Sequence, residues 1–380
     1  MLAVSLPILP DAGYRYVNEV LRSGWWGYGP AARSLERYAE QWCGGGALAT
    51  SSCTAALHLA LLASGVRPRD EVIVPALTFS STAAVVMHAG CIPRFADVDR
   101  ESLTLSPDSV ARQLSCRVKA VIPVHFAGVP VDMESLEAAV APSGAVIIDD
   151  AAHAFGSQRD NWHVGSRSPF TCFSFAPTKS VPSPDGGLLV FRDKSLESLL
   201  RELSDMGLHV DTFGRSPRKL AAAKPNEIVR LGYHYRMNDL AAAIIIASIE
   251  ELETIIAKRE SLVAAYRSLL LSLPECELMA VPRNSRVSWY IYPIRVPQQL
   301  RDHLRDKLAR SGIDSSVHYP CLHDQPAFVG CPGESQTARS ESNRLITLPL
   351  HTDMTVSDVE QICFVVESVL RPRSRRRRAA

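Results

Sequence analysis

The stretch FSFAPTKS, residues 173–180, places one lysine directly after an apolar segment that is typical of a buried strand. Lys179 lies in a proline-containing loop, and the carboxyl ends of parallel strands are where an α/β sheet binds its ligands. Taken alone, a lysine in such a loop is more often a solvated charge than a reactive amine. When it is desolvated or flanked by cations, however, its pKa falls and it can form an imine with an aldehyde. Lys179 is therefore a candidate nucleophile whose role depends on the rest of the chain.

Segments of strand type alternate with segments of helical length around this lysine, from residue 47 to residue 191. Residues 54–64 and 80–89 are rich in small and apolar side chains and are of helical length. The short apolar runs that we interpret as buried strands are residues 71–75, 92–95, 120–124, 145–148, 171–175 and 188–191. This alternation is typical of a mostly parallel sheet covered by helices on both faces. The predicted fold class is therefore α/β.

The chain changes character after residue 236. Residues 238–271 contain neither glycine nor proline and carry apolar side chains at helical spacing, which predicts one long helix or two in succession. Beyond it we expect a strand near 288–296, a helix near 298–310, a strand near 315–319, a polar loop over 331–341 and a final helix near 356–370. The predicted organisation is a large α/β domain (1–247), a smaller C-terminal α+β domain (248–370) and a basic, disordered tail (371–380).

The composition is that of an ordinary globular protein of 380 residues, with 46% hydrophobic and 21% charged side chains and a formal net charge of +1. Six of the 41 basic side chains lie in the last ten residues, so residues 1–370 carry a net charge of −5. An arginine run of this kind could touch nucleic acid or a membrane surface, but a solvated chain end is the simpler interpretation. We expect neither a nucleic-acid partner nor a membrane partner.

Nine cysteines are scattered along the chain, without a CxxC pair and without histidines at metal-binding spacing. Several lie in apolar stretches, where a buried thiol is the ordinary state. We therefore expect a reduced, cytoplasmic protein with no structural disulfide and no metal site. The N-terminal segment lacks a basic region and is interrupted by Pro7 and Pro10, so it does not read as a signal peptide. No apolar run approaches the roughly twenty residues that a membrane-spanning helix needs.

Two adjacent aspartates end a strand-like run in VIIDDAAHAFG, residues 146–156. Because side chains alternate along a strand, Asp149 and Asp150 point to opposite faces, and only one of them can face a given site. A carboxylate at a strand end can pair with a protonated pyridine nitrogen, bind a metal or cap the following helix. The metal interpretation has no further ligands at suitable spacing, so the other two remain.

A run of small hydroxyl residues opens a helical pattern in ATSSCTAALHLALLASG, residues 49–65. Backbone N–H groups at a helix start, together with serine and threonine hydroxyls, form a phosphate-binding site. An ordinary helix cap would give the same pattern. The chain thus offers a candidate reactive lysine, a strand-end carboxylate and a candidate phosphate turn.

In order and content these segments resemble the DegT/DnrJ/EryC1/StrS family, the sugar aminotransferases among the fold-type I enzymes that depend on pyridoxal 5′-phosphate (PLP). The resemblance covers nearly the whole chain. Its further motifs are SGWWGYGP (23–30), VPALTFSSTA (74–83), IPVHFAG (122–128), LGYHYRMNDL (231–240), VHYPCLHDQPAF (317–328) and TLPLH (347–351). It implies an aspartate aminotransferase-like fold, with a mostly parallel central sheet and a smaller C-terminal α+β domain.

The family's functional residues fall on matching positions of this chain. The resemblance implies that Lys179 is the catalytic Schiff-base lysine, that Asp150 pairs with the pyridine nitrogen and that Ser174 binds the cofactor phosphate. Residues 232–238 match a loop that reaches into the neighbouring subunit, so His234, where the family usually has asparagine, would bind the partner's phosphate in a homodimer with shared active sites. The other cofactor contacts that it implies are Cys53, Thr54 and Ala55 at the phosphate turn, Phe79 against the ring and His153 beside the ring oxygen.

The family's substrate-contacting segments fall on Trp26, Tyr28, His318 and Tyr319, where ordinary packing is an equal alternative. The implied reaction moves an amino group from glutamate or glutamine, through pyridoxamine phosphate (PMP), to a keto group of a nucleotide-linked sugar in antibiotic, other natural-product or surface-glycan biosynthesis. A keto-cyclitol acceptor, a PLP-dependent dehydratase or lyase that makes an amino-aromatic precursor, and a non-catalytic regulatory subunit remain alternatives. Lys179 argues against a sugar dehydratase of this family, in which histidine replaces the lysine.

Overall fold

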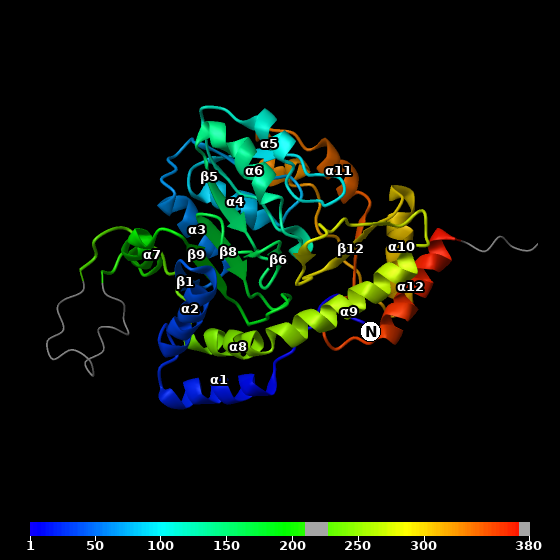
Figure 1. Ribbon diagram of the computed structural model, residues 1–380, viewed down its shortest axis with the longest axis horizontal. Coiled ribbons are helices and arrows are strands. Elements are labelled where there is room, and N and C mark those ends of the chain that lie inside the picture. Colours follow the sequence, from blue (N-terminus) through cyan, green and yellow to red (C-terminus); the bar gives the residue numbers. More distant parts are fainter. Residues whose placement is uncertain (210–226, 372–380) are drawn as a thin grey trace, which may run out of the picture.

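The computed structural model describes residues 1–209 and 227–371 (Figure 1). A large lobe is built on a seven-stranded sheet, and a smaller lobe carries helices α10 (Gln298–Arg310) and α12 (Val356–Leu370). Nearly all of the predicted basic tail, residues 372–380, lies outside the described residues. None of the helices formed by the described residues is both long and apolar enough to cross a membrane.

The central sheet has the strand order β1-β9-β8-β5-β4-β2-β3. The pairs β2–β3, β2–β4, β4–β5 and β5–β8 are parallel, whereas β9 is antiparallel to both of its neighbours, β1 and β8. The predicted mostly parallel α/β sheet is therefore confirmed. The strands are β1 (Gly46–Thr50), β2 (Glu71–Pro75), β3 (Ile92–Ala96), β4 (Val118–Val121), β5 (Val146–Asp150), β8 (Phe170–Ser174) and β9 (Gly187–Phe191).

Helices cover both faces of the sheet. Because successive side chains of a strand point to opposite faces, they pack against two different layers of helices. Cys172 of β8 joins the apolar core under α3 and α4, whereas the next residue, Phe173, joins the core under α2 and α8. Ile73 of β2 joins a third core under α5 and α6. The helices are α2 (Pro30–Cys43), α3 (Cys53–Ala63), α4 (Ser80–His88), α5 (Pro107–Gln113), α6 (Met133–Val140), α7 (Glu197–Ser204) and α8 (Asp239–Glu250).

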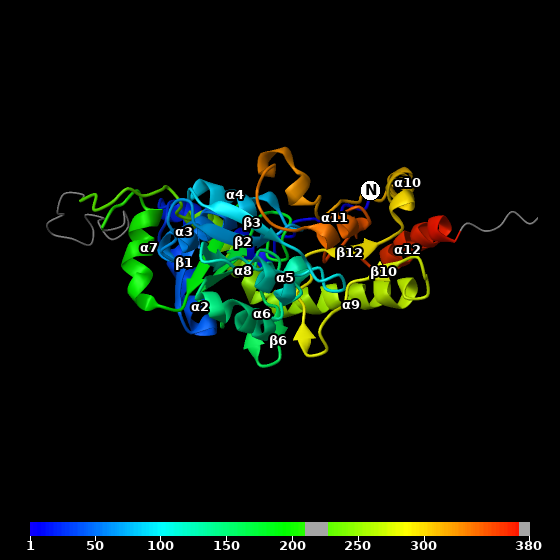
Figure 2. The same ribbon diagram turned by 90° about the horizontal axis from the view of Figure 1, so that it is seen from above.

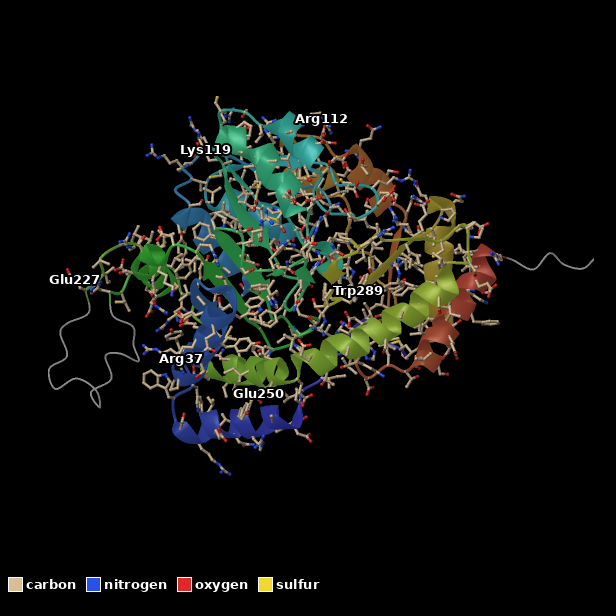
Figure 3. The ribbon with its side chains drawn as sticks, in the orientation of Figure 1. Arg37, Arg112, Lys119, Glu227, Glu250 and Trp289 are labelled. Carbon is tan, nitrogen blue, oxygen red and sulfur yellow. The ribbon has the colours of Figure 1, made fainter. Side chains whose placement is uncertain are left out.

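The predicted helical region 238–271 forms two helices in succession, α8 and α9 (Leu252–Leu270). The Asn238 side chain accepts a hydrogen bond from Ala241 N (2.8 Å) and so caps the start of α8. Helix α1 (Asp11–Ser23) packs along the outside of α8, and Glu250 of α8 lies on the side that faces α1 (Figure 3). The Tyr16 hydroxyl of α1 donates to the Glu250 carboxylate at 2.9 Å. Figures 1 and 2 show α9 running on from the large lobe into the smaller one, so that it links the two.

The smaller lobe holds the antiparallel sheet β10 (Glu277–Leu278), β12 (Tyr292–Arg295) and β13 (Leu345–Leu348). Helices α10 and α12 confirm the predictions for 298–310 and 356–370. Leu2 N donates to Gly312 O, and Asp314 N donates to Leu2 O, both at 2.8 Å, so the first residues of the chain lie in this lobe. A small third sheet combines β6 (Gln158–Arg159), β7 (Trp162–His163) and β11 (Ser285–Arg286).

Two predictions for this lobe are wrong. The expected strand near 315–319 is absent from the described chain, because Ser316 forms only an isolated bridge with Thr347 and the segment then turns toward the large lobe. The expected polar loop over 331–341 contains the start of helix α11 (Gln336–Ser342). Its first turn is capped by Asp97, whose carboxylate accepts from Thr337 N across 240 positions of sequence, so no local signal marks the helix.

Candidate active site

A pocket of about 380 Å³ lies at the carboxyl ends of β5 and β8, and residues of both lobes line it. Strand ends, the first turn of α3 and the loops after β2 and β8 supply one wall, and residues of the smaller lobe supply the other. Nine residues singled out from the sequence line it: Cys53, Thr54, Phe79, Asp150, His153, Ser174, Lys179, His318 and Tyr319. The location is the one at which doubly wound sheets bind ligands.

The first turn of α3 forms one end of the pocket. The Ser52 hydroxyl accepts a hydrogen bond from Ala55 N (3.1 Å) and caps the helix, and the other N–H groups of a first turn have no helical acceptor. Ser174, the last residue of β8, lines the same pocket. Gly187 of β9 brings these parts together, because a Cβ there would lie 2.3 Å from the carbonyl carbon of Ser52. Backbone donors and hydroxyls at this end suit a phosphate group.

Asp150 ends β5 and is only 3% exposed. Its Oδ2 accepts from the Thr82 hydroxyl (2.8 Å) and its Oδ1 accepts from Ala152 N (3.1 Å). Burial raises the pKa of Asp150, and the Thr82 hydrogen bond, the Ala152 N–H and the nearby Lys179 charge oppose that rise. The neighbouring Asp149 points to the other face of the sheet, as alternation along a strand requires.

Lys179 is half-buried in the loop after β8, and its Nζ lies 3.8 Å from the centroid of the Tyr290 ring. This is the geometry of a cation–π contact. The Tyr290 hydroxyl is 3.2 Å from the Thr178 hydroxyl, which ties the ring to the same loop. Sequence reasoning missed Tyr290, because it stands in a run that predicts only a strand, and its partners come from distant segments.

His153 follows β5 and lines the pocket. It is 4% exposed, and its ring centroid lies 4.3 Å from that of Tyr290. Its Nδ1 accepts a hydrogen bond from Ala127 N (3.3 Å), so the neutral ring carries its proton on Nε2 and donates it to the Tyr319 hydroxyl (3.0 Å). Burial, with the charge of Lys179, lowers the pKa of His153 well below its usual range. The imidazole is therefore uncharged at neutral pH.

His318 and Phe79 complete the walls. The His318 Nδ1 is 2.9 Å from the Thr347 hydroxyl, and burial together with the Lys179 charge lowers the pKa of His318 to about 4. Phe79 remains 55% exposed, and its ring lies 5.9 Å from that of Tyr319. The pocket residues that the sequence did not single out are Ser52, Thr78, Ser81, Val124, Ala152, Ala176, Thr178, Asp185 and Tyr290.

Four residues singled out from the sequence do not line this pocket: Trp26, Tyr28, Ala55 and His234. Trp26 is 55% exposed at the end of α1, and its indole N–H donates to Leu21 O. Tyr28 is 6% exposed, and its hydroxyl is shared between Glu36 and Arg201 at 2.9 Å from each. His234 is exposed on a loop that bridges to Asp205.

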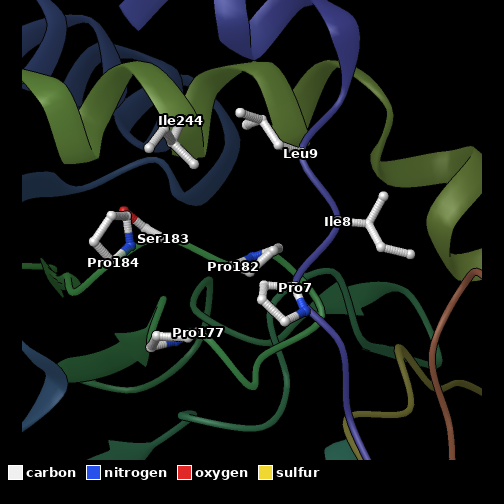
Figure 4. A pocket seen from close by; sticks show the side chains of 8 residues that line it. All are labelled: Pro7, Ile8, Leu9, Pro177, Pro182, Ser183, Pro184 and Ile244. Carbon is white, nitrogen blue, oxygen red and sulfur yellow. The ribbon is translucent and has the colours of Figure 1, made fainter. Parts of the chain in front are cut away.

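A second, smaller pocket of about 220 Å³ lies behind the loop that carries Lys179 (Figure 4). There the N-terminal segment crosses the proline-rich chain after the lysine, and the lining is almost wholly apolar. The residues around it are Pro7, Ile8, Leu9, Pro177, Pro182, Ser183, Pro184 and Ile244. The three prolines of the loop, Pro177, Pro182 and Pro184, and these contacts restrict the loop and therefore the position of Lys179.

Over the described residues, no group of three metal-binding side chains comes together.

Residues 9–367 match the model of the DegT/DnrJ/EryC1/StrS aminotransferase family. Among solved structures, the aminotransferase TlmJ from Streptoalloteichus hindustanus is 29% identical, with 97% of this chain and 99% of that chain covered and a TM-score of 0.90. The candidate sugar aminotransferase Spr1654 from Streptococcus pneumoniae, in a PMP form, is 27% identical, with 97% and 99% covered and a TM-score of 0.90. DesI, studied in the presence of its TDP-sugar product, is 26% identical, with 98% and 94% covered and a TM-score of 0.86.

Proposed function

Because the chain belongs to the DegT/DnrJ/EryC1/StrS aminotransferase family, we propose that it transfers an amino group from glutamate or glutamine to a keto group of a nucleotide-linked sugar. It is a PLP-dependent aminotransferase. One observation carries the proposal: a single pocket brings together a lysine amine, a buried carboxylate and the start of a helix. A TDP-sugar is the product of the similar enzyme DesI, which favours the same acceptor class here. Natural-product or surface-glycan biosynthesis uses such acceptors.

The pocket residues fit the parts of PLP. We assign the phosphate to Cys53 and Thr54, which open α3, and to Ser174, which ends β8 and lines the same pocket. Ala55, implied by the family resemblance, lies in the same turn, but its N–H donates to the Ser52 hydroxyl. The buried carboxylate of Asp150 suits the ring nitrogen, Phe79 suits the ring face, and His153 suits the ring oxygen. When bound, the cofactor supplies an electron sink for the bond changes at the substrate carbon.

Lys179 has two roles in this proposal. Its amine would hold the aldehyde carbon of the cofactor, and the free amine would move a proton to or from the substrate carbon. Tyr290 lies under the amine at 3.8 Å and limits where the released amine can move. His153 and His318 are uncharged at neutral pH, so they add no positive charge beside it.

We also propose a homodimer with shared active sites, in which His234 binds the cofactor phosphate of the partner subunit. His234 is exposed and does not line the pocket of its own chain. Large apolar side chains stand exposed just before it, with Ile228 at 68% and Leu231 at 93%, as is typical of a surface that another chain covers.

Trp26 and Tyr28 remain candidate substrate contacts, and Trp26 is exposed as a shared site would require. The nine free cysteines fit a cytoplasmic location.

The test begins with the colour of the purified protein. We expect a yellow absorbance that bleaches when glutamate or glutamine is added and returns when a TDP-linked keto sugar follows. Lys179→Ala should be colourless, whereas Lys119→Ala should match the wild type, since Lys119 is an exposed lysine at the edge of the large lobe (Figure 3). A wild type that binds no PLP would overturn the enzyme assignment. Bleaching that keto sugars never reverse would overturn the acceptor class.

A further inference from the structure

Thr82 on α4 reaches Asp150 from outside the pocket. It is fully buried, at 0% exposed, and its hydroxyl lies 2.8 Å from Asp150 Oδ2. A second hydroxyl, that of Thr78, lies 2.9 Å from the Thr82 hydroxyl and is 1% exposed. Thr78 lines the pocket, but Thr82 does not. The three side chains thus form a buried row that ends on the carboxylate.

The chemistry of the groups fixes the direction of these hydrogen bonds. An ionised carboxylate can only accept, and a hydroxyl has one proton to donate. Thr82 therefore gives its proton to Asp150, and Thr78 must donate to Thr82. Because solvent has almost no access to either threonine, water cannot easily replace a donor that is removed.

The two oxygens of Asp150 are held from different sides. Oδ2 accepts from Thr82 and Oδ1 accepts from Ala152 N at 3.1 Å, so the carboxylate cannot rotate without breaking one of these bonds. Asp150 also lines the pocket, so its carboxylate can be reached by a ligand there. We infer that Thr82 is a positioning residue that fixes Asp150 toward the ring nitrogen of the cofactor, with Thr78 supporting it. This inference rests on the proposed role of Asp150.

The charge balance at Asp150 supports the same conclusion. Burial raises the pKa of Asp150, and the hydrogen bond from Thr82 is the strongest influence that opposes the rise. Without that donor the carboxylate would take up a proton more readily, and a protonated acid cannot stabilise a positive ring nitrogen. Thr82 therefore supports both the orientation and the charge of Asp150.

The test compares Thr82→Val, which keeps the shape and removes the donor, with Thr82→Ser, which keeps the donor. Thr171→Val is the matched control, since Thr171 is also 0% exposed and its hydroxyl lies 3.5 Å from Asp149 Oδ2, on the other face of β5. Apoprotein of each variant is titrated with PLP to obtain Kd, the rate of bleaching by glutamate is followed in one turnover, and the Tm of the apoprotein is recorded. We expect Thr82→Val to raise Kd by about tenfold and to slow bleaching by at least as much. Thr82→Ser and Thr171→Val should keep both values within about twofold of the wild type.

Several outcomes would overturn the inference. Thr82→Val with wild-type Kd and bleaching rate would show that Asp150 needs no support from this hydroxyl. An equal loss in Thr82→Ser or in Thr171→Val would show that packing, and not the donated proton, matters. Asp150→Asn distinguishes the inferred role of Thr82 from the proposed role of Asp150. If Asp150→Asn is impaired while Thr82→Val is not, only the role of Thr82 fails. If Asp150→Asn behaves as wild type, the proposed role of Asp150 itself fails.

Discussion

Asp149 and Asp150 are neighbours on β5, both at most 3% exposed, yet they face different surroundings. Asp150 has two hydrogen-bond donors behind it and an open pocket in front. Asp149 faces His125, whose Nε2 lies 3.4 Å from Asp149 Oδ2. Since His125 Nδ1 accepts from Val131 N (3.1 Å), a neutral His125 turns its Nε2 proton toward Asp149. One carboxylate is thus presented to a ligand, and the other is buried beside His125 on the opposite face of β5.

The largest expected difference between the two is in activity. Asp150→Asn keeps the size of the side chain but removes the charge that the ring nitrogen needs, so we expect turnover to fall on the order of a thousandfold. Asp149→Asn should leave turnover within about tenfold of the wild type, because its side chain lies on the opposite face of the sheet. Steady-state kinetics at saturating PLP measures both. Equal losses in the two variants would remove the distinction between the faces.

The stability of the protein should depend on pH through the two histidines that line the pocket, His318 and His153. An unfolded His318 takes up a proton as pH falls below about 6.5, whereas the folded residue does so only near pH 4, because burial and Lys179 lower its pKa to about 4. The unfolded state therefore binds more protons in this window, and stability falls as pH is lowered through it, by at most about 3 kcal/mol from this residue. His153, whose pKa is also lowered, contributes in the same direction.

Urea unfolding of the apoprotein at several pH values between about 4 and 7 measures this effect. His318→Gln should flatten the curve, because glutamine does not titrate and can still bond to the Thr347 hydroxyl. If the variant and the wild type lose stability in parallel, His318 is not the group responsible.

Asp149, unlike Asp150, should affect the stability of the fold more than turnover. Asp149→Ala removes the carboxylate that lies 3.4 Å from His125 Nε2 and accepts from the Thr171 hydroxyl (3.5 Å), so we expect the free energy of unfolding to fall by about 1–3 kcal/mol. His125→Ala should cost a similar amount, and the double variant should cost less than the sum, since the two residues are in contact. Chemical denaturation of the three apoproteins gives the coupling. Strict additivity would show that the 3.4 Å approach contributes nothing.

The sequence predicted these two faces only in part. Alternation along a strand showed that one aspartate could face a site, but not which one, and the family resemblance supplied the choice. Helix α12 was predictable because Thr355 and Asp358 form a capping box within its first turn. Helix α11 was not, since its cap is Asp97 of the large lobe. Thr82 and Tyr290 escaped for the same reason, because their partners come together only when the chain folds.

The smallest expected effect concerns Tyr290, which faces the same pocket as Asp150 and lies under Lys179. Tyr290→Phe keeps the ring and loses the contact with Thr178, so we expect the bleaching rate with glutamate to change by about threefold or less. Tyr290→Leu removes the ring face that lies 3.8 Å from the amine and should slow bleaching by about tenfold. The rate of borohydride reduction of the bound cofactor gives a second measurement, since it reports how accessible the lysine link is. If Tyr290→Phe and Tyr290→Leu slow bleaching equally, the hydroxyl of Tyr290 and not its ring positions Lys179. Tyr290 would then act through a hydrogen bond, as we infer for Thr82 at Asp150.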